Sequence, residues 1–292
     1  MEYSETCTER SRSIRNPYLP YPVVIRKITD ENEARDIKTF ELVFRDDADR
    51  DSFTFRCGQF AELSVLGAGE CPIGIASSPM ETGYVQFTVK RTGVVTSALH
   101  NCEEGATIGV RGPYGNGFPM DMLEGSNVVI VAGGFAFTTL RSLTKYILHP
   151  ENRARFRDLI VIYGARSPGE LIYKYDLEDW AERDDLQLHV TVDAGDEGWT
   201  GLVGYVPTIL KEAAPSSDNA VAVVCGPPIM IKFSIPVLDE LGFPPGRIIN
   251  SLEMRMKCGI GKCGRCNIGD KYVCKDGPVF TFEELQNMPR EY

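Results

Sequence analysis

Residues 127–148, NVVIVAGGFAFTTLRSLTKYIL, form the stretch of this sequence that decides the fold. Its first part, NVVIVAGG (127–134), is a continuous apolar run, which is typical of a strand buried on both faces. After the two glycines the apolar residues recur at helical spacing, at Phe137, Leu140, Leu143 and Ile147. A buried strand that runs through glycines into a helix indicates the start of a parallel, doubly wound sheet.

The chain continues this alternation of strands and helices toward its C-terminal end. The segments expected as strands are DLIVIYGAR (158–166), LQLHVTVD (186–193), NAVAVVCGPP (219–228) and RIINSLE (247–253). The segments expected as helices are residues 174–182, VPTILKEA (206–213) and IMIKFSIPVLDELG (229–242). Sites in such sheets lie at the carboxyl ends of the strands. We therefore expect ligands near AGGFAF, YGARSPGE, VDAGDEGW and CGPPIM.

The residues before this stretch have the pattern of an antiparallel sheet. YVQFTVKR (84–91) alternates apolar and polar side chains, and TFELVF (39–44) and GQFAELSV (58–65) read in the same way. Glycine and proline separate these runs, as in a barrel or sandwich. The pattern ends in the turn-rich RGPYGNGFPM (111–120), which we interpret as a domain boundary.

Four segments have the composition of nucleotide-binding turns, and each also has a purely structural reading. AGGFAF leads into a helix start that favours a phosphate, but a tight turn needs the same glycines. In CGPPIM the proline at a helix start favours a structural role, and Cys225 is either a cofactor contact or a small buried residue. ECPIGIASSP (70–79) and KRTGVVTSALH (90–100) fit either a pyrophosphate site or a turn that enters a helix capped by Thr96.

Four of the nine cysteines lie between residues 258 and 274, in CGIGKCGRCNIGDKYVC, with the spacing C-x4-C-x2-C-x7-C. Four thiolates suit tetrahedral zinc, but zinc ribbons usually pair two short knuckles across a longer loop. The spacing C-x4-C-x2-C with a later cysteine is that of plant-type 2Fe–2S ferredoxins. The loop's glycines allow it to curl and to aim amides at the sulfurs, and its basic residues offset negative charge; these are Gly259, Gly261, Gly264, Lys257, Lys262 and Arg265.

Length and charge exclude several classes of protein. A chain of 292 residues has room for two domains and a small appendage. Its formal net charge of −10 argues against a nucleic-acid-binding protein. The polar first residues and the lack of a long apolar run predict a cytoplasmic protein without a signal peptide or transmembrane segment. Clustered cysteines in the cytoplasm bind metal or do redox chemistry more often than they form disulfides.

Taken in order, these motifs resemble the ferredoxin–NADP+ reductase superfamily, and within it the branch with a C-terminal 2Fe–2S cluster. That branch includes the electron-transfer subunit of dihydroorotate dehydrogenase, sulfhydrogenase gamma subunits and flavin reductase subunits of heterodisulfide-reductase-like complexes. The resemblance covers about residues 17–285. It implies an N-terminal arm (1–16), an FAD-binding antiparallel β-barrel (17–120), an NAD(P)-binding α/β domain with a doubly wound parallel sheet (121–246) and a 2Fe–2S segment (247–292).

The resemblance also implies which residues meet each cofactor. The residues implied at the flavin ring are Pro72, Ile73, Gly74 and Ile75, and those implied at the FAD pyrophosphate are Gly93, Val94, Val95 and Thr96. Those implied at the nicotinamide nucleotide are Gly133, Gly134, Phe135, Gly226 and Pro227, with Cys225 beside them. The cluster ligands would be Cys258, Cys263, Cys266 and Cys274.

The sequence departs from the family's pattern at both nucleotide sites. Many relatives have R-x-Y-[ST] at the flavin, where this chain has Cys71 at the arginine position and Gly74 at the hydroxyl position. Phosphate contacts must then come from elsewhere, for example from Arg91. Many relatives also have G-G-x-G-x-x-P after the first strand of the nucleotide domain, where this chain has Ala136 for the third glycine and Thr139 for the proline.

The function that the resemblance implies is an electron-transfer flavoprotein subunit. NAD(P)H would reduce FAD, and electrons would pass through the 2Fe–2S cluster to a partner redox subunit, or in the reverse direction. Asp193 favours NAD by meeting a ribose hydroxyl, whereas Arg166 and Ser167 suit the 2′-phosphate of NADP. No domain for a terminal substrate is visible, which predicts a hetero-oligomer. The alternatives are a stand-alone NAD(P)H reductase of a small acceptor and a zinc-stabilised binding module.

Overall fold

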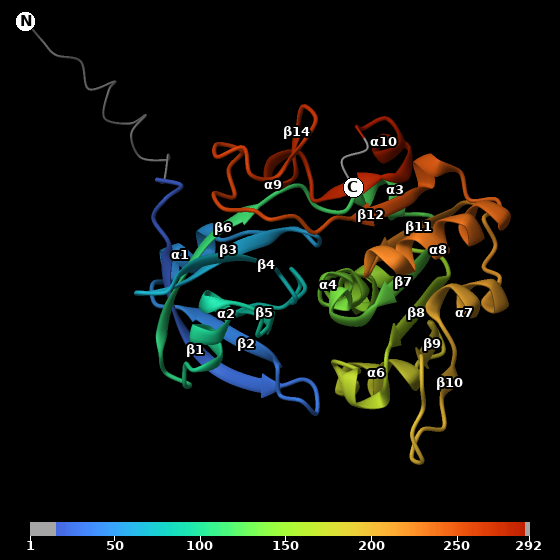
Figure 1. Ribbon diagram of the computed structural model, residues 1–292, viewed down its shortest axis with the longest axis horizontal. Coiled ribbons are helices and arrows are strands. Elements are labelled where there is room, and N and C mark those ends of the chain that lie inside the picture. Colours follow the sequence, from blue (N-terminus) through green and yellow to red (C-terminus); the bar gives the residue numbers. More distant parts are fainter. Residues whose placement is uncertain (1–15, 290–292) are drawn as a thin grey trace, which may run out of the picture.

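Six antiparallel strands form the first sheet of the computed structural model, which describes residues 16–289 (Figure 1). Their order is β4-β3-β6-β1-β2-β5. Their bounds are Tyr21–Asp30 (β1), Ile37–Phe44 (β2), Phe60–Val65 (β3), Gly69–Gly74 (β4), Val85–Lys90 (β5) and Thr107–Tyr114 (β6), with the short helices α1 (Asp47–Ser52) and α2 (Val94–His100) between them. A bridge from Ile75 to Phe87 joins the two edges and closes the sheet into the expected barrel.

Seven strands form the second sheet, in the order β10-β9-β8-β7-β11-β12-β15. All its pairs are parallel except β12 with β15. Their bounds are Asn127–Gly133 (β7), Leu159–Ala165 (β8), Gln187–Val192 (β9), Leu202–Val203 (β10), Ala220–Cys225 (β11), Ile248–Ser251 (β12) and Val279–Thr281 (β15). The expected doubly wound sheet is therefore confirmed, with one short antiparallel strand added at an edge.

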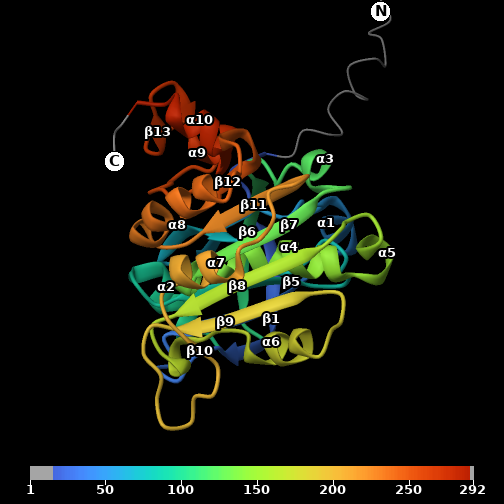
Figure 2. The same cartoon turned by 90° about the vertical axis from the view of Figure 1, so that its right-hand side faces the viewer.

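Helices cover both faces of this sheet (Figure 2). The main ones are α4 (Phe137–Leu148), α6 (Lys174–Ala181), α7 (Val206–Ala213) and α8 (Pro228–Glu240); α3 (Met120–Leu123), α5 (Pro150–Arg153) and the turns η3 (Gly134–Ala136), η4 (Pro168–Glu170) and η5 (Pro245–Arg247) are shorter. Val128 and Ile130 pack into a core with α4 and α6, whereas Val129 and Val131 pack into a core with α7 and α8. The apolar run at 127–134 is thus buried on both faces, as its composition predicts.

The cysteine-containing segment lies over the barrel and also joins the parallel sheet (Figure 1). It contains the hairpin β13 (Asn267–Ile268) and β14 (Lys271–Tyr272), then α9 (Val273–Asp276), β15 and α10 (Phe282–Gln286). Its small core packs Cys266, Val273 and Cys274 against Phe60 of β3. Because β12 and β15 belong to the seven-stranded sheet, the cysteine-containing segment shares that sheet instead of standing apart from it.

Helix α4 connects the barrel and the parallel sheet. The buried Arg141 forms an ion pair with Asp176 of α6 and donates to the carbonyl of Ala76 beyond β4 at 3.1 Å. One residue later, the Ser142 hydroxyl donates to the carbonyl of Ser77 at 2.7 Å. A cavity of about 260 Å³ between the two sheets is lined by charged and polar side chains, Arg141 among them. These contacts fix how the chain leaving β4 packs against α4.

The structure bears on two further expectations, the N-terminal arm and the membrane-spanning segment, only within the described residues. The expected N-terminal arm, residues 1–16, lies outside the described residues except for Asn16. Among the helices of residues 16–289, none combines the length and the apolar character needed to cross a membrane.

Candidate functional site

The cysteine loop is shaped by three glycines with left-handed backbone conformation. Gly259, Gly261 and Gly264 each have φ near +70°, which other residues rarely adopt. This curl turns backbone amides toward sulfur: the amide of Gly261 lies 3.1 Å from Cys274 Sγ, and that of Lys262 lies 3.3 Å from Cys258 Sγ. The loop therefore forms the amide-to-sulfur geometry expected from its glycines.

The four thiols of this loop are arranged as two pairs. Within the first pair the Cys263 side chain helps to lower the pKa of Cys258, and within the second the Cys266 side chain helps to raise the pKa of Cys274. Within residues 16–289 no three Cys, His, Asp or Glu side chains converge on a point that would hold a single metal ion. Two pairs suit the two irons of a 2Fe–2S cluster, so the residues present fit this cluster.

The environments of the first and last thiol differ. Burial acts to raise the pKa of Cys258, but the backbone amides of Ile260, Cys263 and Lys262 outweigh it and lower the pKa from 9.0 to about 6. Burial raises the pKa of Cys274 to about 12, and the neighbouring Cys266 adds to the rise. Amides aimed at a sulfur stabilise negative charge on it, as a thiolate ligand requires.

Arg111 of β6 anchors the loop to the barrel. Its side chain is 3% exposed and forms a two-pronged ion pair with Glu70 of β4, in which Nη2 lies 2.6 Å from Oε1 and Nε lies 3.1 Å from Oε2. Its Nη1 donates to the carbonyl of Cys258 at 2.8 Å, to the Tyr114 hydroxyl at 2.8 Å and to the carbonyl of Pro17 at 3.2 Å. One guanidinium thus joins β4, β6, the cysteine loop and the N-terminal side of the barrel.

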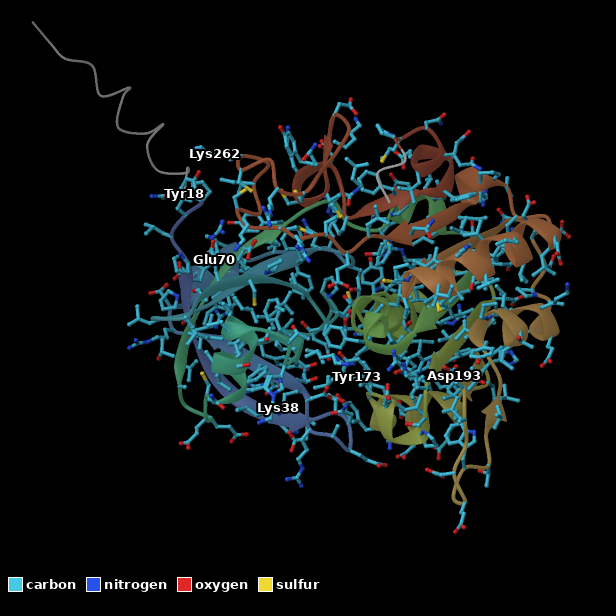
Figure 3. The ribbon with its side chains drawn as sticks, viewed as in Figure 1. Tyr18, Lys38, Glu70, Tyr173, Asp193 and Lys262 are labelled. Carbon is cyan, nitrogen blue, oxygen red and sulfur yellow. The ribbon has the colours of Figure 1, made fainter. Side chains whose placement is uncertain are left out.

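The end of β6 forms the rest of the platform under the loop. The Tyr114 ring packs so closely on Gly259 that a Cβ there would lie 2.6 Å from the ring. The Asn116 amide donates to the carbonyl of Val279 at 2.7 Å and accepts from the amide of Val279 at 2.9 Å. Figure 3 shows Lys262 of the loop beside Tyr18, and its Nζ lies 5.5 Å from the centre of that ring.

Glu62 of β3 is a buried carboxyl group between the barrel and the cysteine loop. The residue has no exposed surface, and neither carboxyl oxygen has a hydrogen-bond partner among the described residues. Burial, together with Glu70 and against the effect of Arg111, raises its pKa from 4.5 to about 7. Arg111 does not pair with it, because the guanidinium already bonds Glu70 and three oxygens elsewhere.

The residues predicted at the flavin lie together on one side of the barrel. Pro72, Ile73 and Gly74 form the end of β4, and Ile75 follows as the buried residue of the closing bridge. Strand β4 lies against α2, since a Cβ on Gly69 would be 3.7 Å from Val95.

The start of α2 brings together the residues predicted at the pyrophosphate. Gly93 precedes the helix, a Cβ on it would meet no atom within 4 Å, and Val94 is 76% exposed. The Thr96 hydroxyl accepts from the amide of Gly93 at 2.8 Å, and Arg91 is exposed just before this turn. The open surface beside Gly93 and Val94 leaves room for a ligand backbone to approach, which fits FAD.

The residues predicted at the nicotinamide nucleotide meet at the carboxyl ends of β7 and β11. A Cβ on Gly133 would lie 2.5 Å from Met230 Sδ, and one on Gly226 would lie 2.4 Å from Met230 Cε. A side chain at either position would therefore push the end of the Met230 side chain aside. Gly134, with φ of +56°, has no atom within 4 Å of its Cβ position and faces open space. The lack of a side chain at Gly133 and Gly226 makes room for Met230, whereas at Gly134 it leaves open space that a ligand could occupy.

Three further predicted residues lie at the same edge of the sheet. Arg166 and Asp193 follow β8 and β9 and are both exposed, and the amide of Ala194 donates to the carbonyl of Arg166 at 3.0 Å. Partial burial raises the pKa of Asp193, and Arg166 opposes this rise. Cys225 is buried, its thiol bonds the carbonyl of Ser251, and burial raises its pKa to about 12. This contact favours the structural role for Cys225.

Sequence reasoning missed the residues that join the segments. Arg111 and Tyr114 lie in RGPYGNGFPM, which the sequence marks only as a turn-rich boundary. Glu62 occupies a polar position in an alternating strand, so nothing in its neighbours indicates burial. The sequence did contain a signal for Arg111. A basic residue within a strand that continues into the GPYG turn indicates that its charge is paired with another part of the protein.

Known families match three parts of the chain in the order of its structural units. An oxidoreductase FAD-binding domain matches residues 25–118, and an oxidoreductase NAD-binding domain matches residues 130–235. The iron–sulfur cluster binding domain of dihydroorotate dehydrogenase B matches residues 253–286, which contain all four clustered cysteines. The matched families assign FAD, a nicotinamide nucleotide and an iron–sulfur cluster to this chain, against the zinc alternative.

Complete relatives match nearly the whole chain. Sulfhydrogenase 1 subunit gamma of Pyrococcus furiosus is 38% identical over 94% of this chain and 94% of its own length. A probable dihydroorotate dehydrogenase B electron transfer subunit of Thermococcus kodakarensis is 35% identical over 90% of this chain and 97% of its own. A chain of NADH-dependent reduced ferredoxin–NADP oxidoreductase is 26% identical, with a TM-score of 0.71 over 96% of this chain and 95% of its own.

Proposed function

This chain belongs to the family of sulfhydrogenase gamma subunits and dihydroorotate dehydrogenase B electron-transfer subunits, and on that premise we propose its electron path and partner. Electrons pass between a nicotinamide nucleotide and a partner redox subunit of the hydrogenase or heterodisulfide-reductase kind. When bound, FAD exchanges a hydride with the nucleotide and single electrons with the 2Fe–2S cluster, which carries them one at a time. In this proposal residues 17–120 bind FAD, residues 121–246 bind the nicotinamide nucleotide and residues 247–292 bind the cluster.

The barrel residues hold FAD in this proposal. The end of β4, from Pro72 to Gly74, lines the ring, and the turn at Gly93 receives the pyrophosphate. The open backbone at Gly93 supports this assignment, because a phosphate can approach amides that no side chain covers. Arg91, exposed before the turn, supplies the positive charge that Cys71 does not.

The edge of the parallel sheet binds the nucleotide. Gly134 and Phe135 line its approach, and Gly226 and Pro227 lie across from them at the end of β11. We assign NAD in preference to NADP because Asp193 is exposed at the end of β9, where a carboxylate accepts from a ribose hydroxyl and repels a 2′-phosphate. Arg166 beside it reduces this repulsion without removing it.

The observation that carries the proposal is the anchoring of the cysteine loop to the flavin strand through Arg111. The same guanidinium bonds Glu70, two residues before the ring-lining part of β4 begins at Pro72, and the carbonyl of the ligand Cys258. This contact holds the cluster loop against the barrel at a fixed position. A fixed position of the loop supports electron transfer between the two cofactors, which a freely hinged cluster segment would not.

The partner would meet the cluster at the outer side of the loop. Residues 262–265 are all exposed, and they include the ligand Cys263. Lys262 and Arg265 add positive charge there, on a chain whose formal net charge is −10. A partner subunit with an acidic surface beside its own redox centre fits this edge.

An anaerobic absorption spectrum before and after addition of NADH tests the proposal. We expect overlapping flavin and cluster bands, both bleached by NADH. The matched variant Cys263→Ser should lose the cluster band and keep the flavin band bleached by NADH, whereas Cys102→Ser, outside the loop, should leave both bands unchanged. A wild-type spectrum with stoichiometric zinc and no cluster band, or bands that neither NADH nor NADPH bleaches, would overturn the proposal.

A further inference from the structure

Two departures from the family's sequence pattern meet in space. Gly74 stands where many relatives have a hydroxyl residue at the flavin, and Thr139 stands where many have a proline at the start of the nucleotide-domain helix. Gly74 ends strand β4 of the barrel, whereas Thr139 lies in helix α4, which packs on the parallel sheet. A Cβ on Gly74 would lie 3.0 Å from Thr139 Oγ1, so the threonine hydroxyl fills the space beside the end of β4.

The Thr139 hydroxyl has no partner within the part of the chain that the structure describes. Other hydroxyls of α4 do have one: Thr144 Oγ1 bonds the carbonyl of Leu140 at 2.9 Å, and Ser142 Oγ bonds that of Ser77 at 2.7 Å. Thr139 is half-buried, in the first turn of the helix. Its hydroxyl therefore keeps a donor and an acceptor for a ligand at this wall.

The position of this hydroxyl is held by the contacts that follow it. One helical turn after Thr139, Ser142 bonds Ser77, which lies the same number of residues after Gly74. Arg141 bonds the carbonyl of Ala76 at 3.1 Å. Helix α4 and the chain leaving β4 thus run side by side in a fixed register, which holds the backbone of Thr139 beside Gly74.

We propose that Thr139 supplies the hydroxyl that β4 lacks, and that it donates a hydrogen bond to the isoalloxazine ring of FAD. The proposal rests on the proposed function, since it requires the ring to lie against Pro72–Ile75. Thr139 is then a cofactor-positioning residue that reaches the ring from the nucleotide domain. Gly74 is its complement, because a side chain on Gly74 would displace the threonine hydroxyl.

The test uses purified full-length protein and three variants at this position. Thr139→Val keeps the shape and removes the hydroxyl, and Thr139→Ser keeps the hydroxyl. The double variant Gly74→Ser with Thr139→Ala moves the hydroxyl to the opposite wall and clears space for it. The measurements are FAD dissociation constant, position of the visible flavin band and flavin midpoint potential.

We expect Thr139→Val to weaken FAD binding by about tenfold, which is the effect of losing one hydrogen bond. The same substitution should shift the visible flavin band and the flavin midpoint potential. Thr139→Ser and the double variant should restore the wild-type band and potential. Thr144→Val is the matched control, because its hydroxyl bonds its own helix, and it should leave all three measurements unchanged.

The outcomes separate this inference from the proposed function. Wild-type protein that binds no FAD would overturn the proposed function, and the inference with it. Bound FAD whose affinity, band and potential are unaffected by Thr139→Val would overturn the inference alone. The same holds if Thr139→Ser behaves like Thr139→Val, since that result would assign the effect to packing of the methyl group.

Discussion

The guanidinium of Arg111 donates a 2.8 Å hydrogen bond to the backbone carbonyl of Cys258, a residue 147 positions later in the chain. This bond joins the barrel to the first predicted ligand of the cluster. Because the same side chain is buried and paired with Glu70, its removal leaves several polar groups without partners at once.

Replacing Arg111 with methionine should therefore release the cysteine loop. We expect the free energy of unfolding to fall by about 3 kcal/mol, the usual cost of removing one partner of a buried ion pair. Arg111→Lys should recover only part of it, because an ammonium cannot reproduce the two-pronged bond to Glu70. Denaturant unfolding and retention of the cluster's visible circular dichroism measure both effects.

Exposed Arg255 serves as the control for Arg111. Arg255→Met also removes one positive charge, from the cysteine-containing segment itself, and should cost less than about 0.5 kcal/mol. An Arg111→Met protein that keeps its cluster and unfolds like the wild type would contradict the anchoring role.

The fold follows from local patterns in the sequence to a large extent. The expected helix after the two glycines begins at Phe137 and ends at Leu148, because an apolar stripe at helical spacing is strong there. Most strands of the parallel sheet are also well marked, since burial on both faces gives continuous apolar runs such as Ala220–Cys225. The parallel edge strand β10, two exposed residues, was not expected from the sequence. The antiparallel strand β15 has only three residues and carries no such signal.

The candidate site was predictable only where its residues are adjacent in the chain. The cysteine loop identifies itself by spacing, because four ligands fall within one short segment. The contacts of Arg111 with Cys258, and of Gly74 with Thr139, join segments that are far apart in sequence. Local periodicity contains no information about which distant segments pack together, so these relationships required the three-dimensional structure.

The buried carboxyl group of Glu62 predicts a pH-dependent stability. Its pKa is raised from 4.5 to about 7 in the folded protein, chiefly by burial. Between these values the folded state holds a proton that the unfolded state has lost. The free energy of unfolding should therefore fall as pH rises through this range, by up to about 3 kcal/mol, and level off above it.

Glu62→Gln and Glu62→Leu should both remove this part of the slope, since neither side chain titrates. Urea unfolding of the wild type and of both variants, at several pH values from 4.5 to 8, isolates the contribution as a difference in slope. If the slope persists unchanged in both variants, other groups cause it and the assignment to Glu62 is wrong.

The buried Arg141, which pairs with Asp176, should contribute strongly to the free energy of unfolding, because it links helix α4 to the barrel. Arg141 is 2% exposed and also bonds the carbonyl of Ala76 and the side chain of Gln86. Arg141→Met should lower the free energy of unfolding by about 3–5 kcal/mol, because it leaves a buried carboxylate and two oxygens without a partner.

The exposed pair Lys211–Glu240 gives the matched control for Arg141, with side chains 65% and 60% exposed. Lys211→Met should cost at most about 1 kcal/mol. Comparable losses from the two substitutions, measured by the same denaturant titration, would show that the contact between the sheets does not depend on Arg141.

The exposed carboxylate of Asp193 predicts the choice of nucleotide. Replacing it with serine removes a ribose-hydroxyl acceptor and a charge that repels a 2′-phosphate, and it leaves Arg166 free to attract that phosphate. We expect the ratio of kcat/KM for NADPH to that for NADH to rise by at least about tenfold, equivalent to about 1.4 kcal/mol. Reduction of an artificial acceptor such as ferricyanide measures both values.

Adding Arg166→Met to Asp193→Ser should reverse the gain for NADPH, because no charge then remains to pair with the phosphate. A wild-type protein that already prefers NADPH, or a ratio unmoved by Asp193→Ser, would place the adenosine ribose elsewhere on this edge.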